Sequence, residues 1–295
     1  MFSERGLDRH PRRGTAVKYI SQVRPTRLRL VDSFSSRPFD GNPAAVVTLE
    51  SMPSVDWLAA MARETNASDT GFVLPGSGSE ADFQLRWFTP KMEVDLCGHA
   101  TLAAAHCLFE DGIRSPIRFA TRSGILTVTQ EPDGSLAMDL PAQPPSHVPV
   151  EADVAAALGL AVEWTGRSPD GFFLLAVVPD ERTVRSWTVD PNAVATLDAM
   201  ALILTAVADA GQTHQFVSRL FAPKAGISED PVTGSSHTVL GPYWGERLGQ
   251  ATLVGLQASA RSGRVAVRLY ADRVIVTGRA VTVFDGVIVG AALPG

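Results

Sequence analysis

The chain has few cysteines, no long apolar run and no excess of basic residues. Its 295 residues include only two cysteines, Cys97 and Cys107, which is too few for a disulfide framework and predicts a reducing, cytoplasmic location. The longest obvious apolar run, Phe172 to Val178, is far shorter than the roughly 18 residues of a membrane-spanning helix. A net charge of −5 gives no general attraction to nucleic acid or to an anionic membrane. We therefore expect neither a nucleic-acid nor a membrane partner.

Sequence motifs of the common cofactors are missing as well. No GxGxxG follows a predicted strand and no GxxxxGK[ST] is present, so the loops that cradle dinucleotides and nucleoside triphosphates are absent. The sequence also has no GxSxG nucleophile elbow, no HExxH pair and no Cys/His cluster. We therefore expect neither a cofactor nor a metal ion.

What is present is the composition of a folded protein with a sizeable core. Hydrophobic residues make up 45% and charged residues 19% of the chain, which excludes disorder as the main state. The length allows one large domain or two of middling size. Residues 1–27 are rich in arginine and lack the apolar stretch of a secretion signal, so we expect a disordered basic leader rather than a transit peptide.

Alternating strand and helix patterns predict an α+β fold. Ser54 is a predicted N-cap for a helix that ends near Asn66, and small residues from His99 to Phe109 form a second predicted helix. A proline-rich stretch after Leu140 predicts the boundary between an N-terminal lobe, 28–140, and a C-terminal lobe, 141–295. An exchange of strands near the termini stays open.

Short matches recur in the same order in both halves. Arg86–Lys91 (RWFTPK) resembles Arg219–Lys224 (RLFAPK), and Gly98 opens a predicted helix as Gly234 does. Arg122-Ser123-Gly124 recurs further on as Arg261-Ser262-Gly263. Collinear matches with slowly growing offsets indicate an internal duplication, hence two similar lobes. Because small molecules commonly bind between domains, we expect the site in the cleft between the lobes.

Each half contains a turn of small residues that leads into a predicted helix. The free N–H groups at such helix starts carry partial positive charge and suit a carboxylate or a developing oxyanion. Pro242 is expected to kink or restart the second helix. The residues that we predict to bind an anionic substrate are Gly98, Ala100, Thr233, Gly234 and Ser235.

Three side chains near these turns are candidates for proton transfer. Asp69 follows a predicted helix and precedes an apolar strand, a setting in which burial raises a carboxyl pKa. His99 and Asp230 lie beside the two turns, although a lone aspartate in a turn is more often a cap. Cys97 could act as a thiolate at a helix start, but a small buried residue is the favoured interpretation.

At these residues the sequence resembles the PhzF-like family, which is named for the phenazine-biosynthesis isomerase and is related in fold to diaminopimelate epimerase. The resemblance covers nearly everything after residue 28. The matching segments are Val31–Phe34, Gly41–Val46, Ala62–Thr70, Phe88–Pro90, Cys97–Thr101, Arg219–Pro223 and Glu229–Ser235.

The resemblance implies two pseudo-symmetric lobes, each with a barrel-like sheet around a central helix, and an active site between them. The family's acid/base carboxylate is usually a glutamate in Asn-x-Ser-Glu, and Asp69 occupies that position here. The family's second aspartate and its cleft histidine map onto Asp230 and His99. Related epimerases face two cysteines across the cleft, whereas here Cys97 faces Thr233, which disfavours a two-thiol racemase.

Together these features predict a cofactor-independent isomerase that moves a proton on a small carboxylated substrate. Asp69, His99 and Asp230 are its predicted catalytic residues. A thiol-assisted amino-acid epimerase and a non-catalytic small-molecule binding protein are the alternatives. A homodimer is a further expectation.

Overall fold

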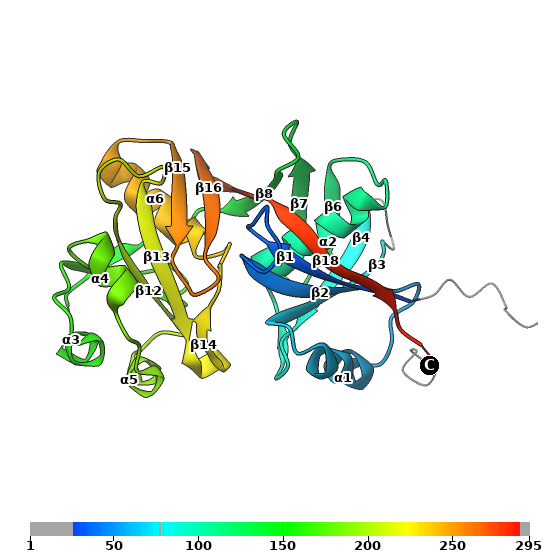
Figure 1. Cartoon of the computed structure of the whole chain (residues 1–295), viewed down its shortest axis with the longest axis horizontal. Helices are drawn as coiled ribbons and strands as arrows, with labels where there is room; N and C mark the ends of the chain where they lie inside the picture. The colour runs from blue at the N-terminus through cyan, green and yellow to red at the C-terminus, as the bar shows by residue number, and fades with distance from the viewer. Residues whose placement is uncertain (1–25, 77, 79, 151, 290–295) are drawn as a thin grey trace, which may run out of the picture.

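The computed structural model describes residues 26–76, 78, 80–150 and 152–289. The leader expected at residues 1–27 lies outside the described residues, except for its last two positions. The described chain forms two lobes side by side, each with a curved sheet around one helix (Figure 1). The predicted fold class, α+β with two lobes of this kind, is confirmed.

The N-terminal lobe wraps its strands around helix α2 (Gly98–Glu110). The strands are β1 (Arg27–Ser33), β2 (Asn42–Thr48), β3 (Asp69–Pro75), β4 (Phe83–Phe88), β5 (Glu93–Val94), β6 (Ile117–Thr121), β7 (Gly124–Gln130) and β8 (Leu136–Pro141). Ten of the thirteen residues of α2 are buried, and its run of alanines lets the sheet approach closely on all sides. Helix α1 (Val55–Thr65) packs outside, capped by Ser54 as predicted.

The C-terminal lobe repeats this plan around helix α6 (His237–Leu248). Its strands are β9 (Ser146–Val148), β10 (Trp164–Arg167), β11 (Phe173–Val177), β12 (Ala201–Val207), β13 (Phe216–Ala222), β14 (Ile227–Asp230), β15 (Thr252–Gln257), β16 (Gly263–Tyr270) and β17 (Arg273–Gly278). Three short helices lie outside the sheet: α3 (Ala152–Leu158), α4 (Glu181–Ser186) and α5 (Pro191–Thr196). A 3₁₀ turn, Pro223–Ala225, joins β13 to β14.

Strand pairing shows the duplication. The parallel pairs β2–β3 and β4–β6 correspond to β11–β12 and β13–β15. Side chains repeat too, because Arg86 pairs with Glu93 at 2.6 Å and Arg219 pairs with Glu229 at 2.8 Å. Each guanidinium also lies over a phenylalanine ring of its own strand.

The last described strand, β18 (Ala280–Val287), belongs to the sheet of the N-terminal lobe. It runs antiparallel to β1, while β17 pairs with β8 across the junction between the lobes (Figure 1). A single sheet therefore continues through both lobes and places the first and the last described strands, β1 and β18, side by side in one lobe.

The start of α6 differs from the sequence prediction. The helix begins at His237, and Gly234 lies in the preceding turn, where its carbonyl accepts from the His237 N–H at 3.1 Å. Pro242 does not interrupt the helix, although it removes the N–H that would reach the carbonyl of Thr238. That carbonyl accepts from the backbone N–H of Gln143 at 2.9 Å instead, so it keeps a hydrogen-bond partner.

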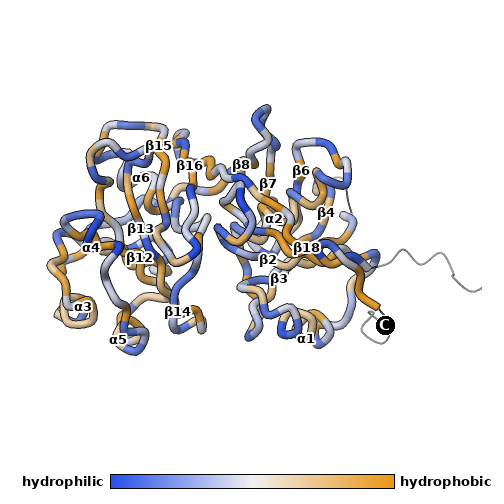
Figure 2. Tube along the Cα trace, viewed as in Figure 1, coloured by the Kyte–Doolittle hydropathy of each residue, from blue (hydrophilic) through white to orange (hydrophobic). Residues whose placement is uncertain are grey.

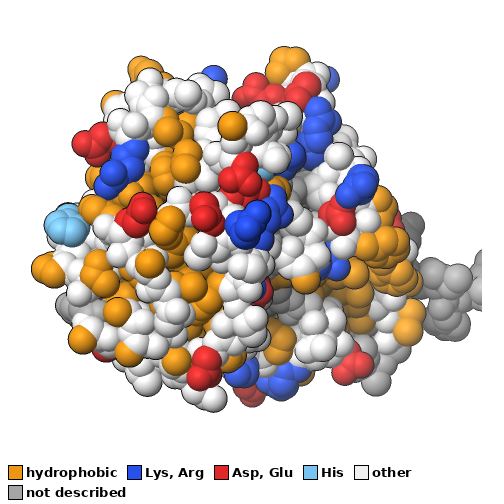
Figure 3. Space-filling model, turned by 60° about the vertical axis from the view of Figure 1, so that its left-hand side comes forward, with side chains coloured by type: hydrophobic (Ala, Val, Ile, Leu, Met, Phe, Trp, Pro, Cys, Tyr) orange, Lys and Arg blue, Asp and Glu red, His pale blue; other side chains and the backbone are white. Residues whose placement is uncertain are grey.

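Apolar residues lie mainly in the interior, and charged residues of both signs lie on the surface. Hydrophobic residues follow the strands and the central helices, and loops are more hydrophilic (Figure 2). On the face in Figure 3, basic side chains lie near acidic ones and form no continuous basic surface. Within the described part of the chain, no helix is long and apolar enough to cross a membrane.

Phe34 fills the junction between the lobes. Its backbone is left-handed, with φ 61°, and its side chain is fully buried. Gly234 and Gly278 leave room for the ring, because a Cβ added to them would lie 3.0 Å and 2.3 Å from its carbons. The ring therefore contacts the backbone of the turn before α6.

This packing predicts that Gly278→Ala destabilises the protein by about 1–3 kcal/mol, because the new methyl group overlaps the Phe34 ring. In a Phe34→Ala background the same change should cost little, since the ring is gone. Urea unfolding of the four proteins measures both effects. Equal costs in the two backgrounds would show that Phe34 is not what requires glycine at 278.

Candidate active site

The predicted site residues converge where the lobes meet. A Cβ added to Gly98 would lie 3.4 Å from the Cα of Gly234 and 3.4 Å from the Ser235 amide nitrogen, so the two turns face each other at a separation that one methyl group would fill. A cavity of about 130 Å³ lies beside this contact. Its lining includes Asp69, Cys97, Gly98, His99, Asp230, Thr233, Gly234 and Ser235. Ala100 is the exception, because it is fully buried within α2 and does not line the cavity.

On the N-terminal side, the first residue of β3 faces the first turn of α2. Asp69 Oδ2 lies 3.5 Å from His99 Nε2, and Cys97 Sγ lies 3.5 Å from His99 Nδ1. All three side chains are buried, and Asp69 is only 5% exposed. The second carboxylate oxygen of Asp69, Oδ1, has no hydrogen-bond partner among the described residues.

Burial changes the acidity of Asp69. Loss of solvent raises its pKa from 3.8 to about 6, and the negative charge of Asp230 adds to this. His99 and a hydrogen bond with Cys97 act in the opposite direction but are weaker than the desolvation. Asp69 therefore exchanges its proton close to neutral pH, as an acid/base catalyst requires.

On the C-terminal side, Asp230 ends β14 and is held by three neighbours. Its carboxylate accepts from Asn42 Nδ2 at 2.8 Å and from the Thr233 hydroxyl. Gln257 donates to the Asp230 carbonyl at 2.8 Å and accepts from the Thr233 N–H at 2.8 Å. These contacts fix the turn that precedes α6.

A chain of hydrogen bonds connects the two sides. Ser68 lies 3.2 Å from His99 Nε2 and donates to Asn42 Oδ1 at 2.8 Å, and Asn42 in turn donates to Asp230. Asn42, Ser68 and Gln257 were not predicted as site residues from the sequence. Asn42 and Ser68 lie within segments that carry the family resemblance, which could have indicated them, whereas no motif marks Gln257.

Cys97 is a protonated thiol at neutral pH. Burial raises the pKa of Cys97 well above its ordinary value of 9.0, and the charge of Asp69 raises it further. The N–H of Ala100 lowers it, but by less than burial raises it. This environment disfavours a thiolate base, in agreement with the favoured interpretation of Cys97 from sequence.

His237, next to the second turn, is structural. It is fully buried, and its Nδ1 lies 2.8 Å from the Thr233 carbonyl. Burial lowers its pKa to about 4, so the ring is neutral and Nδ1 carries the proton that it donates. His237 thereby holds the turn rather than reaching the cavity.

Asp69, Cys97 and His99 are also the residues that could hold a metal ion. One ligand atom from each lies within 4.8 Å of the others in the described part of the chain. Sequence spacing did not show this group, because Asp69 is brought to α2 only by the fold. The expectation of no metal ion rested on spacing alone, and it stays a prediction.

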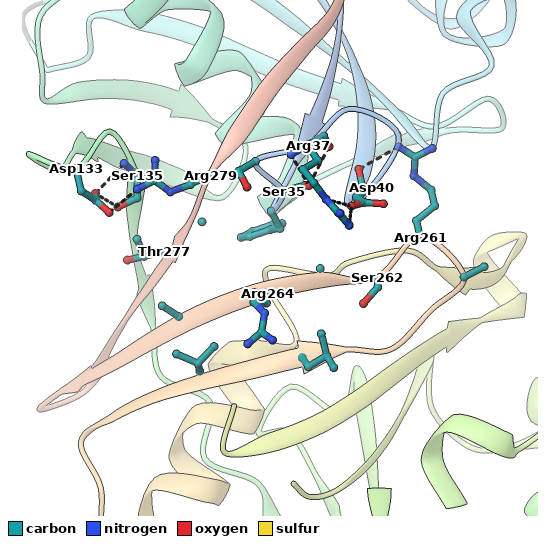
Figure 4. A pocket seen from close by; sticks show the side chains of 18 residues that line it. Ser35, Arg37, Asp40, Asp133, Ser135, Arg261, Ser262, Arg264, Thr277 and Arg279 are labelled. Carbon is teal, nitrogen blue, oxygen red and sulfur yellow. Dashed lines mark hydrogen bonds and ion pairs between the residues drawn. The ribbon is translucent and has the colours of Figure 1, made fainter. Parts of the chain in front are cut away.

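A wider groove between the lobes is not the candidate site. It measures about 770 Å³, and its labelled side chains include four arginines (Figure 4). Arg37 pairs with Asp40 at 2.6 Å and Arg279 with Asp133 at 2.8 Å. None of the buried acid/base side chains lines this groove, so its size does not make it the reactive site.

The fold and the cluster define a class: two-lobed, pseudo-symmetric α+β proteins with acid/base side chains at the lobe junction. The family model described as "Phenazine biosynthesis-like protein" matches residues 31–286. The chain therefore belongs to the PhzF-like, phenazine biosynthesis-like protein family.

Similar proteins and solved structures support this family membership. A protein of Pseudomonas aeruginosa named an uncharacterized isomerase is 44% identical over 260 residues, which are 88% of this chain and 96% of that protein. The crystal structure of a PhzF-family protein from Enterococcus faecalis superposes with a TM-score of 0.82 at 39% identity, covering 89% of this chain and 98% of that chain. A probable proline racemase of Agrobacterium radiobacter shares the fold, with a TM-score of 0.60 at 13% identity, covering 90% of this chain and 93% of that one.

The raised pKa of Asp69 predicts that ionisation of this carboxyl lowers the free energy of unfolding. The folded state holds the Asp69 proton more tightly than the unfolded state, so stability is lost as the pH rises from about 4 to about 6. Asp69→Asn removes this cost and should stabilise the protein at pH 8 by about 1–3 kcal/mol, with no gain at pH 4.

Urea unfolding at both pH values measures the difference. Asp133→Asn is the matched control, because hydrogen bonds from Ser135 lower the pKa of that exposed carboxyl and its removal should give no gain at pH 8. An Asp69→Asn protein that is less stable than the wild type at pH 8 would contradict the raised pKa.

Proposed function

We propose that the protein is a cofactor-independent isomerase that moves a proton on a small carboxylated substrate. One observation carries the proposal: a buried carboxyl group, Asp69, with a pKa of about 6 beside the contact of two helix-start turns. The names of relatives as isomerases support the reaction class.

The arrangement assigns a role to each group. Asp69 in its ionised form takes a proton from a substrate carbon near the carboxylate, and this leaves an enolate-like anion. N–H groups of the first turn of α2, at Gly98, and of the turn before α6, at Gly234, stabilise the negative oxygen, because the first N–H groups of a helix have no partner within it. The proton then returns to a different carbon of the substrate, so the net reaction is an isomerisation without a redox change.

His99 and Asp230 complete the machinery. His99 lies 3.5 Å from Asp69 and orients it or passes the proton on. Asp230 faces the same cavity, and its bonds to Asn42 and Thr233 keep it in place for the returning proton or for a substrate hydroxyl. The link from Ser68 through Asn42 to Asp230 lets the two lobes hold these groups in one geometry.

Two alternatives stay in view. A thiol-assisted amino-acid epimerase would use Cys97, which is disfavoured by its raised pKa and by Thr233 in the position of a second thiol. A non-catalytic binding protein would keep the cavity without turnover. This alternative is favoured by Asp69, whose side chain is one methylene shorter than the family's usual glutamate.

We also propose that the protein is cytoplasmic and forms a homodimer. Light scattering tests the homodimer.

Asp69→Asn should lower turnover by roughly 10²–10⁴-fold, because Asn is nearly isosteric and cannot take a proton. The assay incubates the protein with a set of small carboxylic acids in D₂O and detects deuterium in the substrate by mass spectrometry. Wild-type exchange that persists in the variant removes Asp69 from the mechanism. Wild-type protein that binds such acids without exchange indicates the binding-protein alternative.

Asp69→Glu probes the missing methylene. If the cavity is built around the shorter side chain, Glu overshoots the substrate carbon and activity falls. Increased activity in the Glu variant would show instead that the site retains the geometry of a glutamate enzyme, and that Asp69 is a weakened base.

Cys97→Ser should retain most activity, because the thiol is protonated and serves only as a hydrogen-bond neighbour of Asp69. Cys107→Ser is the matched control, since Cys107 is also free and buried but does not line the cavity. Loss of deuterium exchange in a folded Cys97→Ser protein, with exchange intact in the control, would promote the thiol epimerase.

A further inference from the structure

A second cavity opens beside the active-site cavity. It measures about 610 Å³. On the N-terminal lobe it is lined by residues 92–96, which include β5, and on the C-terminal lobe by residues just before β11 and β12. The two cavities share seven lining residues, among them Leu96, Phe173 and Ser235. They therefore adjoin each other, and we call the larger one the apolar annex, defined by Met92, Leu96, Leu126, Phe172, Phe173 and Met200.

The annex exposes large hydrophobic side chains to solvent. Met92 is 56% exposed, Phe172 44%, Leu96 39% and Met200 39%. These are four of the fifteen large hydrophobic residues that are exposed in the described part of the chain, and both lobes contribute. Because clustered exposed apolar surface is unfavourable in water, such a cluster indicates a binding surface.

The polar part of the annex is acidic. Glu93, Asp95 and Asp170 line it, and Lys224 is its basic residue. Lys224 donates to the backbone carbonyl of Leu197, and Glu93 is neutralised by Arg86 and Arg122. Asp95 pairs with Arg122 at 3.5 Å, whereas Asp170 accepts from the Ser168 hydroxyl and the Phe172 N–H and has no ion pair among the described residues. Asp170 therefore disfavours a second negative charge on the ligand.

We propose that the substrate carries one carboxylate, held at the turns of Gly98 and Gly234, and an uncharged apolar body of several carbons that occupies the annex. The proposal rests on the proposed function for the position of the carboxylate. It adds the chemical class of the rest of the substrate: a hydrophobic monocarboxylate rather than a dicarboxylate or a small polar amino acid.

A homologous series of carboxylates tests this directly on the full chain. Acetate, butyrate, hexanoate and octanoate are titrated by calorimetry, together with adipate, which has a second carboxylate at the far end. We expect the affinity to rise about twofold to fourfold for each methylene added beyond acetate, as burial of a CH₂ group predicts. Adipate should bind at least tenfold more weakly than hexanoate.

The location of the bound chain is read from methionine methyl signals. The protein has six methionines, so labelled methyl groups give a simple NMR spectrum. Octanoate should shift the signals of Met92 and Met200, which line the annex, and leave those of Met52 and Met61 in place.

Matched variants separate the annex from the carboxylate site. Phe172→Ser should flatten the chain-length dependence, because it removes apolar surface from the annex. Acetate has no chain to bury and should therefore lose far less affinity than octanoate. Phe284→Ser removes another exposed phenylalanine, 52% exposed on β18, and should keep the wild-type dependence.

The outcomes distinguish this inference from the proposed function. Acetate binding with no gain along the series, or a gain unchanged in Phe172→Ser, overturns the annex and leaves the carboxylate site standing. Adipate that binds as tightly as hexanoate overturns the single-charge requirement. Failure of every carboxylate to bind overturns the annex proposal together with the anion site of the proposed function.

Discussion

The contact between Gly98 and Gly234 is the constraint on which the rest of the site depends. The backbones of the two lobes face each other there, and a Cβ at Gly98 would already be in van der Waals contact with the opposite turn, at 3.4 Å. The first turn of α2 and the turn before α6 are thereby aimed at one small cavity. Phe34 supports this contact from behind, since its ring packs against Gly234 and Gly278.

The rest of the fold holds that contact in position. Helix α2 is buried on all sides, so its first turn has no freedom to move away from the junction. The sheet passes from β8 to β17 and returns through β18, which joins the lobes with backbone hydrogen bonds. The link from His99 through Ser68 and Asn42 to Asp230 makes the polar groups of both lobes one network. Within it, Asp69 stands apart: it is buried with one oxygen unpartnered, and its raised pKa results from that incomplete solvation.

The sequence predicted the parts of the site that follow from local pattern. Gly98, His99 and Asp69 stand beside helix and strand signals, the repeat pointed to Gly234, and Asp230 stands just before the Gly234 turn. Asn42, Ser68 and Gln257 could not be found that way, because their roles arise from hydrogen bonds between segments far apart in the chain. Ala100 was included with its turn, but the helical period turns it into the core. The continuity of α6 through Pro242 depends on a donor from Gln143, a contact that no local pattern contains.

We propose that burial makes Asp69 a proton carrier close to neutral pH. The most direct test is to follow the carboxyl ¹³C signal of Asp69 by NMR as the pH is varied, with the signal assigned by its loss in Asp69→Asn. We expect a midpoint near 6, raised by desolvation beside the cavity. A midpoint near the ordinary value of 3.8 would show a solvated carboxylate and would contradict the role of Asp69 as the base.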